Sequence, residues 1–246
     1  MTDLHTHILP GMDDGACDAA QGIEMLKLEW AQGVQTVALT PHFYPEREHM
    51  EAFLAHRQKA YEELRNAIAF LPEEEQKQIP KPVLSAEVAW VSGLADLPGL
   101  ERLCYENSRF LLLELPFITW GERLFLELND LVNRTGLVPV IAHVDRYFTI
   151  QNKKRMDQLC ELGLPMQISA TAMDGFLMRR KALRMMRSGE AQLLISDCHN
   201  TVKRPPNLNA AYKEIRRRLG EGMAKELEAC SDALLSTYQE GAWEMA

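Results

Sequence analysis

The chain has 246 residues, of which 46% are apolar and 25% are charged, enough to build a substantial core in one α/β domain. Its formal net charge of −8 argues against a general affinity for nucleic acid or for anionic membranes. We expect a cytoplasmic protein with reduced thiols and no membrane insertion, because its five cysteines form no CxxC pair, its start shows no signal peptide and its apolar runs are short.

Short β-type runs alternate with longer helical patterns along the chain, with no internal repeat. In chain order the predicted strands are TDLHTHI, TVALTPHF, PVLSAEV, RFLLLELPF, LVPVIAHV, PMQISA and QLLISDCH. The predicted helices lie near residues 17–32, 46–71, 95–107, 120–135, 151–162, 174–188, 207–219 and 221–240. Several strands are apolar almost throughout, which is typical of a parallel sheet covered on both faces. Seven strands in this alternation predict a closed or nearly closed β/α barrel, with a doubly wound open sheet as the alternative.

Histidines and carboxylates stand at the ends of these predicted strands. In chain order they are His5 and His7, His42, Glu87, Glu114, His143, and finally Asp197 and His199, while the sixth strand offers only Ser169. In a β/α barrel these ends converge on one face, where active sites form. Each residue alone could be a hydrogen-bonded core residue, but so many carboxylates are costly to bury together unless cations lie between them. The pattern therefore predicts bound divalent metals.

The spacing within two of the strands supports this prediction. Alternate residues of a strand point to the same face, so His5 and His7 can reach one ion together, and Asp197 and His199 repeat that geometry. Nitrogen and oxygen ligands without a thiolate favour zinc, manganese or iron over calcium.

A resemblance to a known family follows from these residues. The motifs DLHTHILPGMDDGA, TPHF, SAEV, LLELPF, IAHVDR and SDCHN…KR resemble the PHP (polymerase and histidinol phosphatase) superfamily. Within it they are most similar to the capsule and exopolysaccharide protein-tyrosine phosphatases of Gram-positive bacteria. The resemblance implies a single domain over residues 1–246, folded as a distorted (β/α)7 TIM-like barrel with additional C-terminal helices. We expect the tail from residue 207 onward to pack on this barrel, with a subunit contact as the alternative.

The resemblance also implies three divalent metal ions, manganese in the first place, with zinc or iron as alternatives. The first ion would be held by His5, His7, Glu87 and Asp197, and the second by Glu87, Glu114 and His143. The third would be held by Asp14, His42 and His199. The family's phosphate-binding arginines correspond to Arg146 and Arg204, although HVDR replaces the usual His-Pro-Glu-Arg around Arg146. Asp13 is either a partner of the ligands or an ordinary turn residue.

The implied function is a metal-dependent protein-tyrosine phosphatase, in which a metal-bound hydroxide attacks the phosphate without a covalent intermediate. Its partner would be a phosphotyrosine protein, in particular a bacterial tyrosine kinase of capsular or exopolysaccharide biosynthesis. The alternatives are a PHP phosphoesterase acting on histidinol phosphate or a nucleotide, and a metal-binding module without activity. CHNTVKR also has the Cys-x5-Arg spacing of cysteine-dependent phosphatases, but it lacks glycine and is followed by Pro205 and Pro206, so we ascribe the match to chance.

Overall fold

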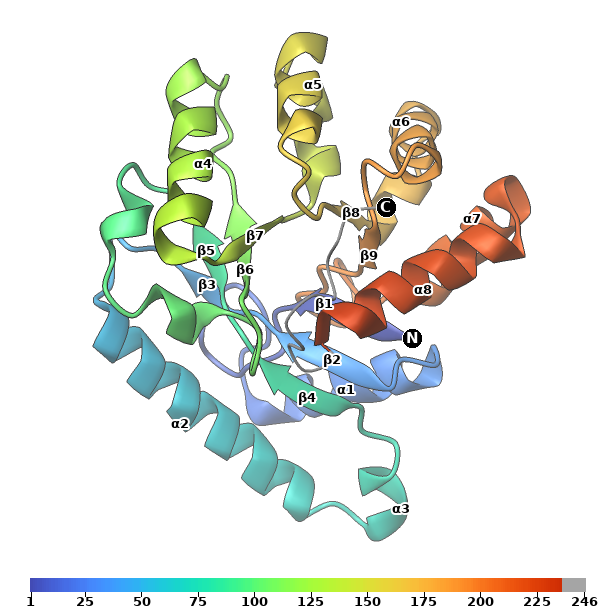
Figure 1. The fold of residues 1–246 in the computed structure, drawn as a ribbon. Coiled ribbons are helices and arrows are strands. Elements are labelled where there is room, and N and C mark those ends of the chain that lie inside the picture. The colour runs from blue at the N-terminus through green and yellow to red at the C-terminus, as the bar shows by residue number, and fades with distance from the viewer. Residues whose placement is uncertain (236–246) are drawn as a thin grey trace.

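The computed structural model describes residues 1–235, in which short parallel strands lie at the centre with helices around them (Figure 1). The strands are β1 (Thr2–Thr6), β2 (Thr36–Leu39), β3 (His42–Phe43), β4 (Lys81–Leu84), β5 (Glu87–Ala89), β6 (Phe110–Glu114), β7 (Val138–Ile141), β8 (Gln167–Ser169) and β9 (Leu193–Ile195). The α-helices are α1 (Ala19–Ala31), α2 (Met50–Ala69), α3 (Glu73–Gln76), α4 (Glu122–Thr135), α5 (Lys153–Glu161), α6 (Phe176–Arg187), α7 (Leu208–Leu219) and α8 (Glu221–Leu235). Four 3₁₀ helices are interspersed, namely η1 (Leu94–Asp96), η2 (Leu100–Leu103), η3 (Val144–Thr149) and η4 (Ala170–Met173).

The strands pair in parallel and form three hydrogen-bonded sheets, in the orders β1-β2-β4, β3-β5-β6-β7 and β8-β9. Two predicted strands are each divided: TVALTPHF gives β2 and β3, separated at Pro41, which has no N–H to donate to a ladder. PVLSAEV likewise gives β4 and β5. The predicted α/β fold with parallel sheets is confirmed, but within residues 1–235 the paired strands do not form one closed barrel.

Most predicted helices are present, and one prediction is wrong. Residues 95–107 form parts of η1 and η2 instead of an α-helix, because Pro98 and Gly99 interrupt the pattern and Gly99 has a φ of +79°. α3 was not predicted from the acidic PEEEQ segment. The predicted helix 221–240 is present as α8 up to Leu235, and its remainder lies outside the described residues.

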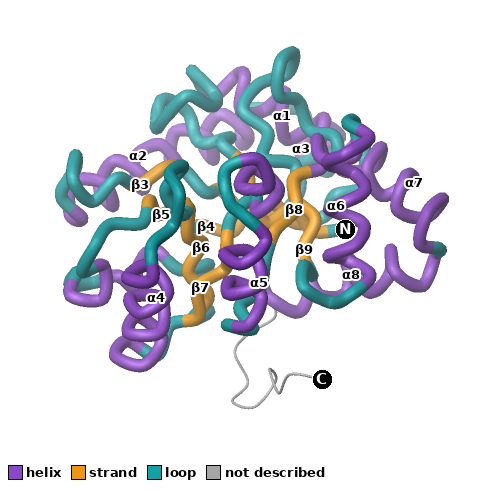
Figure 2. The backbone as a smooth tube through the Cα atoms, turned by 90° about the horizontal axis from the view of Figure 1, so that it is seen from above, coloured by secondary structure: helices purple, strands orange, loops and turns teal. Residues whose placement is uncertain are grey.

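The interior is apolar and is shared by strands of all three sheets. Leu4 of β1, Leu112 of β6 and Ile195 of β9 are fully buried in the same hydrophobic cluster, together with Leu234 of α8. Figure 2 shows the strands inside a ring of helices. α8 contacts β1 and β9, so the tail packs on the sheets as expected as far as residue 235. No helix in residues 1–235 is long and apolar enough to cross a membrane.

Candidate metal centre

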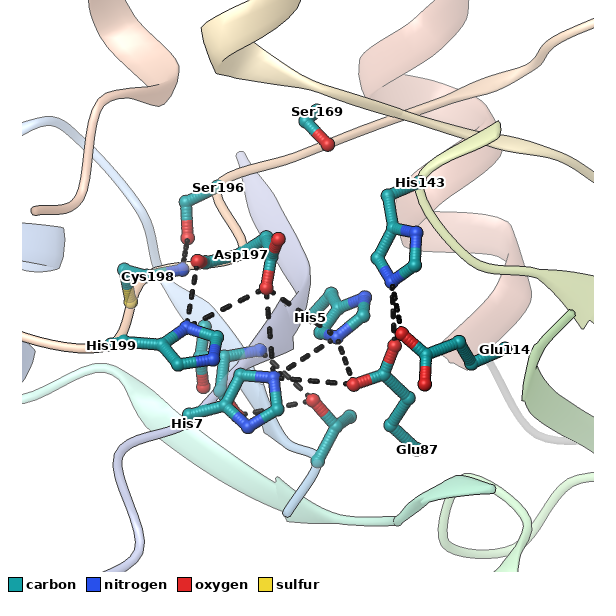
Figure 3. Close-up of polar contacts among 12 residues, drawn as sticks. His5, His7, Glu87, Glu114, His143, Ser169, Ser196, Asp197, Cys198 and His199 are labelled. Carbon is teal, nitrogen blue, oxygen red and sulfur yellow. Dashed lines mark hydrogen bonds and ion pairs between the residues drawn. The ribbon is translucent and has the colours of Figure 1, made fainter. Parts of the chain in front are cut away.

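The carboxyl ends of the strands bring the predicted ligands together. In Figure 3 the labelled imidazoles and carboxylates converge, whereas Ser169 stands apart from them. The parallel register pairs His42 of β3 directly with Glu87 of β5, so neighbouring strands deliver neighbouring side chains. Because the strands share one direction, the polar residues in or directly after β1, β3, β5, β6, β7 and β9 lie on the same face, whereas Ser169 of β8 lies apart from them.

His5 and His7 face each other at the end of β1. Their Nε2 atoms are 3.2 Å apart, and they lie 3.1 and 3.4 Å from Glu87 Oε2. The same two atoms lie 3.8 and 3.6 Å from Asp197 Oδ1. The predicted set of His5, His7, Glu87 and Asp197 is therefore gathered in space, as the spacing of two residues requires.

Glu87 occupies the middle of the cluster. Its Oε1 is 2.7 Å from His143 Nε2, which is also 3.4 Å from Glu114 Oε1. Its Oε2 is 2.9 Å from His42 Nδ1. Burial alone would raise the pKa of Glu87, but the surrounding histidines outweigh that effect and hold this pKa well below its ordinary value. Glu87 thus remains ionised, as a ligand must be.

Asp14, His42 and His199 form the third predicted set. Asp14 Oδ1 lies 3.6 Å from His42 Nε2 and 3.4 Å from His199 Nε2. The Asp14 side chain is 68% exposed, so this part of the cluster opens to solvent. A pocket of about 370 Å³ is lined here by Asp13, Asp14, His42 and Tyr44, among others.

Three groups of these side chains have ligand atoms within 4.8 Å of one another, close enough to hold ions. They are His7, Asp14, His42 and His199; His5, His7 and Glu87; and His42, Glu87 and Glu114. The groups coincide in large part with the predicted sets, although His7 joins the third set, His42 replaces His143 in the second, and Asp197 is missing from the first. Within the described residues, Glu87 Oε2 and His199 Nε2 are buried and make no hydrogen bond, although His42 Nδ1 lies 2.9 Å from the first and Asp14 Oδ1 lies 3.4 Å from the second. Buried nitrogen and oxygen atoms that make no hydrogen bond can act as ligands of a divalent cation, and this set contains no thiolate.

Both predicted arginines border the cluster. Arg204 Nη2 donates to Asp197 Oδ2 at 2.8 Å, and Arg146 Nη2 donates to the same oxygen. About a third of each arginine side chain is exposed, so both side chains contact a buried candidate ligand and also reach solvent. Asp197 and His143 adopt positive φ angles of +55° and +28°, a strained conformation for residues other than glycine. The hydrogen bond to Asp197 shows that Arg146 reaches the cluster although HVDR replaces the usual sequence around it.

Asp13, for which the sequence left two roles open, contacts two of the candidate ligands. Its Oδ2 lies 2.7 Å from His7 Nδ1 and accepts a hydrogen bond from the backbone N–H of His42 at 2.9 Å. Burial would raise the pKa of Asp13, but its hydrogen bond to His7 holds it well below the ordinary value. A carboxylate on the remote nitrogen of a metal-binding histidine fixes the ring's orientation and tautomer.

Sequence reasoning missed a similar partner of His5. Gln167 Oε1 lies 2.9 Å from His5 Nδ1, and Gln167 Nε2 donates to the Tyr105 hydroxyl at 3.2 Å. The available signal was a polar residue inside the apolar run PMQISA, two positions before Ser169 and therefore on the same face of β8.

Cys198 is not placed as a nucleophile. Its side chain is fully buried, its Sγ lies 3.6 Å from Glu29 Oε1, and burial raises the pKa of the thiol well above its ordinary value. Nucleophilic cysteines are accessible and have a lowered pKa. The structure therefore opposes the cysteine-phosphatase alternative.

The fold and the cluster place the chain in a class of protein: parallel α/β proteins with a candidate metal centre at the strand ends. Tyrosine-protein phosphatase YwqE of Bacillus subtilis (strain 168) is 28% identical over 249 residues, covering 96% of this chain and 91% of that protein. Tyrosine-protein phosphatase CpsB of Streptococcus pneumoniae is 28% identical over 243 residues, covering 92% of this chain and 94% of that protein. A solved structure, described as one of YwqE and CpsB, "unique metal-dependent tyrosine phosphatases", matches with a TM-score of 0.81 at 24% identity, covering 97% and 96% of the two chains.

The chain belongs to the capsular polysaccharide synthesis family CpsB/CapC, whose model matches residues 1–234. The resemblance to the capsule-related tyrosine phosphatases is thereby confirmed.

Proposed function

We propose that the chain is a metal-dependent protein-tyrosine phosphatase of capsular or exopolysaccharide biosynthesis. It acts in the cytoplasm on a phosphotyrosine protein, in particular a bacterial tyrosine kinase. The observation that carries the proposal is the convergence of two arginines and a histidine–carboxylate cluster on Asp197, in a family whose members YwqE and CpsB are named tyrosine phosphatases. Positive charge beside metal ligands is the combination that a phosphate dianion requires.

The proposed centre contains three divalent ions, with manganese as the first expectation. The ligand sets are those implied by the family: His5, His7, Glu87 and Asp197; Glu87, Glu114 and His143; and Asp14, His42 and His199. The short distances among these side chains and the buried unpartnered atoms of Glu87 and His199 support this assignment. When bound, such ions lower the pKa of water to supply a nucleophile at neutral pH and neutralise the charge of the phosphate.

The chain's own residues have separate tasks in this proposal. Asp13 holds Nδ1 of His7, and Gln167 holds Nδ1 of His5, so that both Nε2 atoms point into the cluster. Arg146 and Arg204 bind the phosphate oxygens with forked N–H donors and stabilise the charge that develops during transfer. A tyrosine leaving group has a pKa near 10, so it departs more easily than an alkoxide and depends less on a general acid.

We further propose that residues 1–246 form one domain whose three sheets are parts of a distorted seven-stranded barrel. Two isolated parallel bridges support this, one joining Thr6 to Cys198 and the other joining Ile141 to Met166. They connect the sheets at the edges where β1 adjoins β9 and where β7 adjoins β8. The buried cluster shared by strands of all three sheets supports the same arrangement.

The function is tested by comparing a phosphotyrosine peptide, a phosphoserine peptide and histidinol phosphate as substrates of the manganese-loaded protein, with bound metal measured in parallel. We expect the phosphotyrosine peptide to have the highest kcat/KM, and a chelator to abolish its turnover. Preference for histidinol phosphate would identify a small-molecule phosphatase instead. Bound metal without turnover of any of the three would identify a binding module.

A further inference from the structure

The loop of residues 115–121, between β6 and α4, holds an aromatic ring beside the metal centre. The Phe117 ring is stacked on the imidazole of His143, with ring centroids 6.1 Å apart and an interplanar angle of 19°. It also contacts the ring of Tyr147, at a centroid distance of 5.3 Å. Phe117 is nevertheless 47% exposed, so one part of the ring packs against a candidate ligand while another part faces solvent.

Hydrogen bonds fix the backbone on both sides of this ring. The Tyr147 hydroxyl donates to the carbonyl of Leu115 at 2.9 Å, and the Gln151 side chain donates to the carbonyl of Ile118 at 2.7 Å. Both donors come from η3 or the residues directly after it, the segment that also carries Arg146. The backbone on either side of Phe117 is therefore held in place before any ligand arrives, which reduces the entropy lost when a ligand binds.

The loop is anchored by one apolar residue and exposes two others. Trp120 is buried, and its indole N–H donates to the carbonyl of Pro116 at 3.0 Å. Ile118, next to Phe117, is 66% exposed. Single exposed apolar side chains are ordinary on protein surfaces. Among the exposed large apolar residues in the described part of the chain, however, Phe117 is the one stacked on a candidate metal ligand.

Because Phe117 is stacked on His143, a candidate ligand, a phosphate bound at the proposed ions lies within reach of this ring. In an aryl phosphate a single oxygen joins the aromatic ring to phosphorus, so a phosphate bound by Arg146 and Arg204 brings the aryl ring to the edge of the centre. Phe117 offers an apolar surface there, and aromatic rings pair favourably in offset-stacked or edge-to-face arrangements. A serine or glycerol phosphate has no ring to place against it.

We propose that Phe117, together with Ile118, forms a binding subsite for the aromatic ring of the phosphorylated residue. The subsite selects aryl over alkyl phosphates by binding the leaving group, without touching the reacting atoms. This inference rests on the proposed phosphatase function and adds the residues that determine its substrate class.

The test compares Phe117→Ala with Leu126→Ala, a matched removal of a side chain that is 68% exposed on α4. Calorimetry on the manganese-loaded proteins measures the binding of phenylphosphonate and methylphosphonate, which are not hydrolysed. Turnover of phenyl phosphate and of glycerol phosphate is measured alongside. We expect Phe117→Ala to weaken phenylphosphonate binding and to lower kcat/KM for phenyl phosphate by about tenfold, the scale of one aromatic pair. Methylphosphonate binding and glycerol phosphate turnover should change less than about twofold, the Leu126 variant should behave as wild type, and Phe117→Tyr should restore aryl binding.

Two results would overturn the subsite. If aryl and alkyl ligands are lost equally, Phe117 only supports His143, and the bound-metal content of the variant should then fall as well. If neither is affected, the ring does not contact the substrate. Failure of the proposed function is a separate result, because it would show in the wild type as absent phosphatase turnover, whereas the subsite is judged by the ratio of variant to wild type.

Discussion

Replacing Arg204 is the substitution that best distinguishes a phosphatase from other hydrolases with metal centres. Its guanidinium group lies 2.8 Å from Asp197 and 3.8 Å from Asp14, so it can contact a phosphate held by the ions that these carboxylates are proposed to bind. Two unit charges about 4 Å apart interact by roughly 4 kcal/mol at the effective dielectric of a protein surface. The side chain is 36% exposed, so we discount this by half or more for solvent screening, to ~1.4–2 kcal/mol.

Replacing Arg204 with alanine should therefore lower kcat/KM for a phosphotyrosine peptide by about ten- to thirtyfold. Arg204→Lys should recover part of the loss, since an ammonium group lacks the guanidinium fork. The assay is steady-state kinetics on the manganese-loaded protein, with metal content measured in the same samples. Lys203→Ala is the matched control, because Lys203 is an exposed cation of the same loop and should leave kcat/KM unchanged. Wild-type kinetics in Arg204→Ala would refute the reasoning and leave the phosphate role to Arg146.

Three further predictions concern the ligands and the thiol. Asp13→Asn should weaken metal binding by about ten- to a hundredfold, because the carboxylate that holds His7 is lost; an unchanged affinity in a metal titration would contradict this. Cys198→Ser should retain activity within about threefold while a chelator abolishes it, because the thiol is buried; activity that survives the chelator but not the substitution would reverse this conclusion. Metal affinity should increase with pH between 7 and 9. In the metal-free protein burial would lower the pKa of His7, but the hydrogen bond to Asp13 and the negative charges of Asp13 and Glu87 outweigh it and raise this pKa to about 9. A proton must leave His7 before an ion binds, so affinity should increase by up to about a hundredfold over this range and level off above it; a flat profile in titrations at each pH would refute this.

Much of the centre could be predicted because it depends on local rules. The alternation of side chains along a strand placed His5 with His7, and the common direction of parallel strands placed His42 and Glu87 on the same face. Neither rule needs knowledge of the final packing. The same holds for α4, whose apolar spacing and terminal glycine, Gly136, were both visible in the sequence.

The parts that escaped prediction depend on contacts between distant segments. Gln167 lies beside His5 only because the sheet of β8 packs close to that of β1, across 162 positions of sequence. The exposure of Phe117 depends on how Gln151 and Tyr147 hold its loop. Asp13 was ambiguous for another reason, since a turn aspartate can face solvent or a ligand, and only the fold decides between them.

The candidate ligands extend along the chain from His5 to His199, and this spread has a consequence for folding. An ion held by His5 and Asp197, or by Asp14 and His199, would cross-link positions near opposite ends of the sequence. Closing so long a loop removes more entropy from the unfolded chain than closing a short one. All five cysteines are free, so the chain has no disulfide for this task. We therefore expect bound ions to act as cross-links in the folded state. Metal loading should then raise the stability of the whole domain, which should unfold in one cooperative transition.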